Sequence, residues 1–236
     1  MIPYLSEFIG TAMLVILGDG VCVSNSLDGC LFKGSGPVYV MLGWGLAVML
    51  PAMAFGVQSG AHFNPALTIS LAAAGLFKWG MVPGYIIAQM LGGFVGACIL
   101  WVIFKDQFAQ ATDPDVIRGC FCTGPAIRNI PMNILGEVAA TFFLVFFIVT
   151  IPADAASGLG KFFVDAIIMS CGFSLGSTTG FAMNQARDIA PRLAHQILPI
   201  PNKGDSDWGY AVVPLVGPII GGVLGGLLGV VVTGWL

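Results

Sequence analysis

The chain has 236 residues, of which 57% are hydrophobic and only 9% are charged. A soluble domain carries about a quarter charged residues, so this chain has too few to cover its surface in water. Nine Lys and Arg residues stand against twelve Asp and Glu residues. That balance offers no basic surface for nucleic acid. The composition therefore argues against a soluble enzyme, a disordered chain and a nucleic-acid-binding protein, and it favours a protein embedded in a lipid bilayer.

Six apolar runs are long enough for a membrane-spanning helix, which needs about 20 apolar residues. We interpret them as transmembrane helices at residues 3–24, 37–57, 80–104, 131–152, 162–182 and 208–235. Two shorter apolar runs, 64–76 and 184–197, each begin at an asparagine and are too short to span. They predict re-entrant half-helices. We expect loops at residues 24–36, 105–130 and 199–207.

The chain contains an internal repeat. Glu7 begins the segment Glu-Phe-Ile-Gly-Thr in the first span, and Glu137 begins Glu-Val-Ala-Ala-Thr in the fourth. Each half, 1–104 and 131–236, holds three spans and one short helix, and the loop 105–130 joins them. Because three is an odd number, the second half must cross the membrane inverted. The expected fold is an all-α membrane protein with one domain over residues 1–236, six transmembrane helices and two half-helices in inverted three-helix repeats.

The inverted repeat brings the N-termini of the two half-helices together near the membrane midplane. Helix N-termini carry partial positive charge, so this point is hostile to cations. Asn64 and Asn184 are expected to cap the half-helices with their side-chain oxygens and to offer their amide groups to a passing solute. The extended segments before them supply backbone carbonyls that must face a wet cavity. The predicted pore carbonyls belong to Gly60, Ala61, His62, Phe63, Gly180, Ala182 and Met183.

Residues 59–68 and 180–188 resemble the two signature loops of the aquaporin family. Asp188, Arg192 and the pair Pro214-Leu215 are similar to the glycerol-facilitator (aquaglyceroporin) branch. The resemblance covers essentially the whole chain. It implies a homotetramer with one pore per subunit, cytoplasmic termini and a midplane motif made of Asn64, Pro65, Ala66, Asn184, Gln185 and Ala186. We adopt this orientation although the distribution of Lys and Arg among the loops weakly opposes it.

The same resemblance implies a selectivity filter made of Trp44, Gly172, Phe181 and Arg187. Arg187 offers a planar fork of donors for two hydroxyl groups and repels cations. The two aromatic rings provide an apolar corner for a carbon backbone, and Gly172 leaves room that a histidine would fill. This set suits a polyol better than water alone.

One position departs from the family pattern. Gln185 stands where the second motif usually has proline, which presets the first turn of a helix and has no N–H group to satisfy. Glutamine restores an N–H group and adds a flexible polar side chain. The asparagine cap still predicts a half-helix. One alternative is therefore a looser constriction, which would also pass other small uncharged acids or polyols.

Several ionisable residues have two interpretations. Glu7 and Glu137 are either proton-coupling carboxylates or supports that bind the backbone of the re-entrant loops, and their matched positions favour support, as we also expect for Asp188. Arg187 either belongs to the filter or pairs with Asp188. Asp19, inside the first span, either lines the outer vestibule, lies at a subunit contact or assists solute uptake. His62 is expected to brace its loop or line the pore.

We expect a passive channel that conducts small uncharged solutes, such as glycerol and similar polyols and also water, and that excludes ions and protons. Undissociated lactic acid, dihydroxyacetone or urea is the alternative cargo, and an ion-coupled transporter is a further alternative. An enzyme is not expected, because the two histidines form no catalytic or metal cluster. No cofactor or metal is expected. The compact length indicates a multi-pass protein of a bacterial plasma membrane.

Overall fold

The computed structural model describes residues 1–151 and 160–234, in which helices are present and strands are not. The longer helices are α1 Ile2–Ser26, α2 Pro37–Ser59, α3 Pro65–Ala73, α4 Val82–Ile103, α7 Ile130–Thr150, α8 Gly160–Thr179, α9 Gln185–Ile197 and α10 Val212–Thr233. A 3₁₀ turn, Trp79–Met81, precedes α4. The predicted all-helical fold is confirmed, with α3 and α9 as the two half-helices.

Each predicted span corresponds to one helix. Within the described residues, α1, α2, α4, α7 and α10 are long and apolar enough to cross a membrane. In α8 the stretch Phe163–Thr179 is apolar but shorter. Residues 152 and 235, at the predicted ends of two spans, lie outside the described residues. The last span begins at Val212 rather than at residue 208.

The segment 105–130, expected to be a loop, contains two short helices, α5 Lys105–Gln110 and α6 Pro114–Gly119. The side chain of Asp113 caps α6, and Pro114 occupies its first turn. Phe108 and Ile117 are fully buried. The polar composition of this segment favours a loop, but burial of these two side chains gives both helices an apolar anchor. This part of the prediction was wrong.

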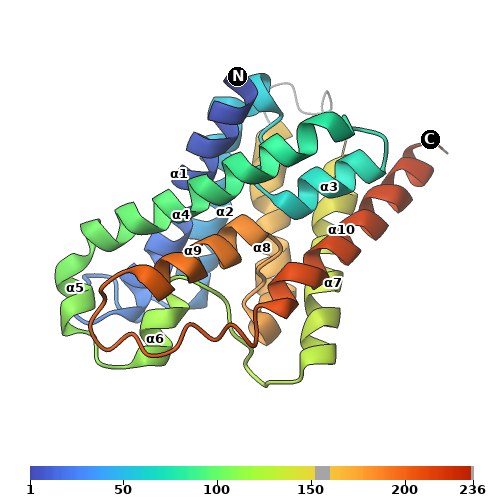
Figure 1. Ribbon diagram of the computed structural model, residues 1–236. Coiled ribbons are helices and arrows are strands. Elements are labelled where there is room, and N and C mark those ends of the chain that lie inside the picture. Colours follow the sequence, from blue (N-terminus) through green and yellow to red (C-terminus); the bar gives the residue numbers. More distant parts are fainter. Residues whose placement is uncertain (152–159, 235–236) are drawn as a thin grey trace.

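The two halves interlock through their half-helices. In the first half α1 packs along α4, and in the second half α7 packs along α10. Half-helix α3 packs mainly against α10 of the second half, and α9 packs against α4 of the first half. Figure 1 shows α3 and α9 between the two long-helix pairs, with both chain termini at one end of the molecule. An even number of membrane crossings places both termini on the same side of the membrane.

The outer faces of the spanning helices are apolar. Exposed large side chains on these faces include Leu46, Leu50, Ile87, Leu224 and Leu228. In water such a surface would promote aggregation, whereas lipid tails solvate it. These faces fit the predicted contact with a bilayer.

Glycines allow the paired helices to approach closely. A Cβ atom at Gly92 of α4 would lie 2.3 Å from the Phe8 carbonyl oxygen of α1. A Cβ atom at Gly221 of α10 would lie 2.0 Å from the Val138 carbonyl oxygen of α7. Both contacts involve backbone, which cannot swing aside as a side chain can. The two halves therefore use the same close packing between their first and third spans.

We predict that Gly221→Ala forces α10 away from α7 and lowers the stability of the folded channel. Overpacking of this kind costs about 1–3 kcal/mol. Thermal aggregation of the detergent-solubilised protein, followed by size-exclusion chromatography, measures the effect. Gly80→Ala is the control, because a Cβ atom at Gly80 meets nothing within 4 Å. Equal aggregation temperatures for both variants would contradict the close-packing argument.

Candidate functional site

The two re-entrant loops, residues 60–63 and 180–183, have the same unusual backbone. The φ angles are positive at the first, second and fourth residues: 84°, 55° and 49° at Gly60, Ala61 and Phe63, and 82°, 41° and 51° at Gly180, Phe181 and Met183. A left-handed conformation at a non-glycine residue costs about 1–3 kcal/mol and persists only where the surroundings enforce it. The shared pattern confirms that the loops are structural repeats of one another.

A buried carboxylate lies behind each loop and holds it. Glu7 accepts the N–H groups of His62 at 3.0 Å and Phe63 at 2.7 Å, and the hydroxyl group of Ser59 at 2.6 Å. Glu137 accepts the two matching N–H groups of the second loop, both at 2.9 Å, and the hydroxyl of the preceding threonine at 2.7 Å. The structure therefore shows both glutamates binding loop backbone, as the loop-support interpretation expects.

These bonds orient the loop carbonyl groups. The N–H groups of Ala182 and Met183 bind the carboxylate behind the second loop, and the same two residues line the cavity in front of it. Within the described part of the chain, the carbonyl oxygens of Ala61 and Ala182 accept no hydrogen bond. They remain available as acceptors for a solute.

The two asparagines cap their own half-helices and also connect the two halves. The side-chain oxygen of Asn64 accepts from the N–H of Ala66 at 2.9 Å, and that of Asn184 accepts from Ala186 at 2.9 Å. The Asn64 amide donates to the Met183 carbonyl at 2.7 Å, and the Asn184 amide donates to the Phe63 carbonyl at 2.8 Å. Each amide therefore has one N–H engaged across the midplane, and only the second is left for a solute.

A narrow cavity of about 150 Å³ passes these groups. This volume equals the share of about five water molecules in the liquid and is far below that of a drug-sized ligand pocket. Part of its wall is polar and comes from Gly60, Ala61, His62, Asn64, Ala182, Met183, Asn184 and Arg187. The rest is apolar or aromatic and comes from Leu14, Trp44, Val48, Ala52, Leu67, Leu71, Leu144, Ile148, Val164, Ile168 and Phe181.

Some residues of the predicted site lie outside this wall. Of the midplane motif, the two asparagines line the cavity, whereas Pro65, Ala66, Gln185 and Ala186 do not. Of the residues with predicted pore carbonyls, Phe63 and Gly180 do not line it. The Phe63 ring instead packs against Gly10 of α1, where a Cβ atom would lie 2.1 Å away.

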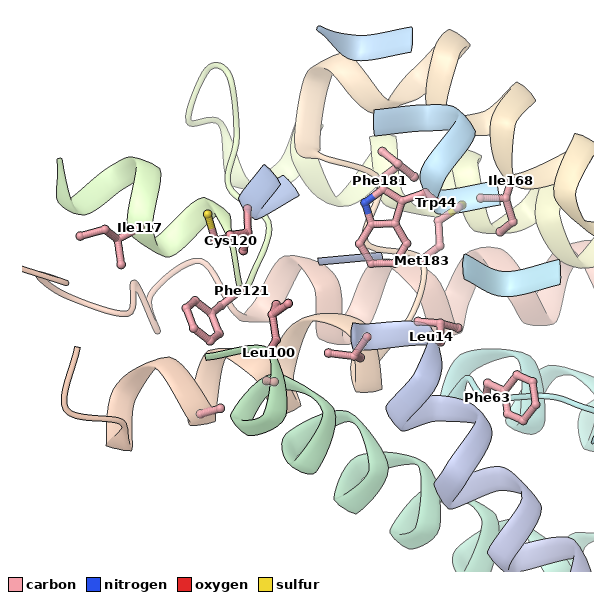
Figure 2. Close-up of a cluster of buried hydrophobic side chains, with 14 of the residues drawn as sticks. Leu14, Trp44, Phe63, Leu100, Ile117, Cys120, Phe121, Ile168, Phe181 and Met183 are labelled. Atoms are coloured by element: carbon pink, nitrogen blue, oxygen red, sulfur yellow. The ribbon is translucent and has the colours of Figure 1, made fainter. Parts of the chain in front are cut away.

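Three of the four predicted filter residues lie together in the cavity wall. The rings of Trp44 and Phe181 are edge to face, with centroids 6.4 Å apart, and the Arg187 guanidinium lies 4.1 Å from the Trp44 ring centroid. Figure 2 shows Trp44, Phe181, Met183 and Ile168 as members of one buried cluster. The predicted open room beside Gly172 is filled, because a Cβ atom there would lie 2.3 Å from the Met41 sulfur. Sequence patterning gave no signal for Met41.

Arg187 pairs with Asp19 of α1, and Nη1 lies 3.0 Å from Oδ1. The alternative in which Arg187 pairs with Asp188 is wrong. Asp188 is instead bound by Arg192, four residues further along α9, at 2.9 Å. The spacing of four residues places Asp188 and Arg192 on one face of α9, whereas Arg187 points elsewhere.

Asp188 and Arg192 fasten two distant loops onto α9. The Asp188 carboxylate accepts both the N–H group and the hydroxyl group of Thr123, at 2.7 and 2.6 Å. The fully buried Arg192 donates to the carbonyl oxygens of Thr123, Ser206 and Asp207 at 2.8–3.0 Å. Asp188 is therefore placed as a support, although it holds the segment after α6 rather than a re-entrant loop. Nothing in the local sequence identifies Thr123 as its partner.

Both histidines have structural surroundings. His62 lines the cavity, and its Nδ1 lies 3.1 Å from the Thr68 hydroxyl. His195 is fully buried, and its Nδ1 lies 2.8 Å from the Ser206 hydroxyl. Burial, with the nearby Lys203 cation, lowers the pKa of His195 to about 4, so its ring is neutral at neutral pH. Among the residues that the structure describes, no group of His, Cys, Asp and Glu side chains is suited to a metal ion.

Gln185 turns its amide away from the cavity and binds α10. Its Nε2 donates to the carbonyl oxygens of Leu215 at 2.9 Å and Pro214 at 3.4 Å. Pro218, inside α10, has no N–H group to donate to the Pro214 carbonyl four residues earlier. The glutamine therefore satisfies a carbonyl that the proline leaves unpaired. It ties the second half-helix to α10 one turn before Pro218.

Comparison with known proteins identifies one family. Residues 2–228 match the major intrinsic protein family. The chain is 48% identical over 218 residues to a probable glycerol uptake facilitator protein of Thermotoga maritima, covering 92% of this chain and 93% of the relative. It is also 48% identical to the glycerol uptake facilitator protein of Bacillus subtilis, covering 92% and 80% of the two chains.

The fold is similar to a solved structure as well. The aquaglyceroporin from Plasmodium falciparum superimposes with a TM-score of 0.85 at 28% sequence identity. The match covers 98% of this chain and 96% of that chain. The similarity therefore includes both halves and both half-helices.

We predict that Glu137→Gln impairs the second loop and lowers the passage of water and glycerol together. A glutamine side chain keeps one acceptor oxygen, but three donors converge on this carboxylate. Each hydrogen bond to a charged group contributes about 1.5–3 kcal/mol. Osmotic shrinkage of proteoliposomes measures both fluxes. Glu7→Gln should behave in the same way, and full flux in either variant would contradict the support role.

We predict that Gln185→Ala lowers stability but leaves the ratio of glycerol to water permeability unchanged. The variant leaves the Pro214 carbonyl unpaired, which costs about 1–3 kcal/mol for a buried group. Because Gln185 does not line the cavity, the path itself stays the same. Thermal aggregation and osmotic shrinkage of the same preparation test both parts. A changed permeability ratio would instead favour the looser-constriction hypothesis.

Proposed function

Because the chain belongs to the major intrinsic protein family, we propose that it is a passive membrane channel through which glycerol and similar small uncharged solutes diffuse. It is a multi-pass membrane protein and a transport protein. Flux follows the concentration gradient of the solute, and no coupling ion is required. We propose that water also passes.

The wall of the cavity is the observation that carries this proposal. Carbonyl acceptors and asparagine and arginine donors stand in the same narrow path as leucine, isoleucine, valine and aromatic side chains. A polyol has hydroxyl groups along one edge and carbon along the other. Such a molecule can exchange its water shell for the polar wall while its carbons contact the apolar wall. The path gives an ion no comparable replacement for its hydration shell.

Exclusion of cations follows from two features. The N-termini of α3 and α9 converge on the cavity through Asn64 and Asn184, and each contributes partial positive charge. Arg187 adds a guanidinium at the filter. Among the described residues of the cavity wall, no carboxylate opposes them. A proton or metal cation therefore meets a barrier where a neutral molecule meets hydrogen-bonding partners.

The roles of individual site residues extend this proposal. Trp44, Phe181 and Arg187 form the selectivity filter, with Gly172 behind Phe181. Asn64 and Asn184 orient solutes at the midplane. The free carbonyl groups of the two loops guide hydroxyl groups between the filter and the midplane asparagines. The loop supports hold these carbonyl groups in place.

The assembly and orientation are also proposals. The protein forms a homotetramer with one pore in each subunit and lies in a bacterial plasma membrane. Both termini face the cytoplasm. Support comes from the family and from the shared position of the two termini at one end of the molecule (Figure 1).

Stopped-flow light scattering on proteoliposomes tests the function. Glycerol, water, urea and lactic acid are compared, the last at one pH below and one pH above its pKa, and empty liposomes give the background. Rapid glycerol flux without an ion gradient is expected. Rapid flux of protonated lactic acid, with glycerol flux at background, would show that lactic acid is the cargo instead of glycerol. Flux that requires an ion gradient would show that the protein is a transporter.

We predict that Arg187→Ala widens the filter and reduces discrimination among solutes. The glycerol-to-water permeability ratio should fall by about tenfold, the equivalent of one lost hydrogen bond to a charged group. Larger polyols should pass faster than in the wild type, because the side chain no longer fills the path. Permeability to erythritol and glycerol, each divided by water permeability, measures the change. Unchanged ratios would show that Arg187 does not contribute to the selectivity of the filter.

A further inference from the structure

One turn of α1 presents three residues to the filter, and none of them lines the cavity. A Cβ atom at Gly18 would lie 2.3 Å from the Trp44 ring, so the ring rests directly on the α1 backbone. The Trp44 indole N–H donates to the Cys22 sulfur at 3.3 Å. Asp19 binds Arg187. The two filter side chains that lie furthest from each other in sequence are thus held by the same turn.

Two contacts hold the Arg187 guanidinium, one to Trp44 and one to Asp19. The guanidinium carbon lies over the Trp44 ring, 4.1 Å from its centroid, and Nη1 is bound to Asp19 Oδ1 at 3.0 Å. The side chains are buried, with 7% of Arg187 and 0% of Asp19 exposed. A buried ion pair is weakly screened, and breaking it by removing one partner leaves an uncompensated charge. Arg187 therefore has little freedom to turn while Asp19 is present.

We propose that Asp19 is a specificity-determining residue that positions Arg187 for polyol recognition, an inference that rests on the proposed function. Asp19 takes one N–H of the guanidinium fork and directs the opposite edge into the cavity. The fork has five donors, so several remain for the hydroxyl groups of a solute.

This role separates polyols from water. A polyol needs two donors at a fixed spacing while its carbons contact Trp44 and Phe181, so it depends on the orientation of the guanidinium. A water molecule needs a single donor and passes a filter in which Arg187 has turned. Loss of Asp19 should therefore lower glycerol permeability much more than water permeability. A general structural defect would lower both.

The test compares four channels in proteoliposomes: the wild type, Asp19→Ala, Arg187→Ala and the double variant. The glycerol-to-water permeability ratio should fall by about tenfold in Asp19→Ala, the size expected for one lost hydrogen bond to a charged group. In the Arg187→Ala background, Asp19→Ala should change the ratio less than about twofold, because Asp19 acts through Arg187. Equal effects in both backgrounds would overturn the proposal.

Asp165→Ala is the matched control. Asp165 is another buried carboxylate in a spanning helix, at 4% exposure. It packs against Gly45 of α2 and does not line the cavity. Its removal should leave the permeability ratio unchanged. A fall as large as that of Asp19→Ala would show a general effect of removing a buried carboxylate and would overturn the positioning role.

A second readout does not depend on solute flux. The small neutral reagent 2,3-butanedione modifies arginine, and mass spectrometry of the digested protein reports the modification of Arg187 separately. Arg187 should react several times faster in Asp19→Ala than in the wild type. Background glycerol flux in the wild type would refute the proposed function, yet this rate would still decide whether Asp19 holds Arg187. An unchanged rate with normal glycerol flux would refute the inference alone.

Discussion

Backbone groups at membrane depth that lack helical partners are the constraint on which this structure depends. On the protein side of the loops no water is at hand, so each unpaired N–H group there carries a large desolvation cost. Glu7 and Glu137 remove that cost by accepting the N–H groups of the two re-entrant loops. The carboxylates lie behind the loops, and the carbonyl groups are consequently left for the cavity. The same bonds that stabilise the loops therefore create the hydrogen-bonding path for a solute.

Because of the inverted repeat, the same arrangement of carboxylate and loop is built from each side of the membrane. Each half supplies one carboxylate, one strained loop and one asparagine-capped half-helix. The asparagine amides then donate across the midplane, each to a carbonyl of the other loop. Half-helix α3 packs on α10, and α9 packs on α4, so neither half can form its part of the pore alone. Glycines at the helix contacts bring the bundle close enough for these short bonds to form.

The filter shows how residues far apart in sequence share one task. Arg187 lies over Trp44 and against Asp19, and Met41 occupies the space beside Gly172. An arginine held on two sides is a directed donor rather than a mobile charge. Gln185 has a different role, because it binds the Pro214 carbonyl that Pro218 leaves unpaired. Its replacement of the usual proline is therefore explained by the packing of α10, at a position outside the cavity wall.

The sequence by itself predicted the six spans, the two half-helices and the inverted repeat, and it favoured loop support over proton coupling for Glu7 and Glu137. Periodicity, run length and the matched motifs carry that information, because a helix in lipid is defined by its own residues. Only the tertiary structure decided that Arg187 pairs with Asp19, that Asp188 holds Thr123, and that α5 and α6 form in a polar segment. These features depend on contacts between residues up to 168 positions apart. No local pattern specifies which buried charge meets which partner, because that choice follows from how the completed halves pack.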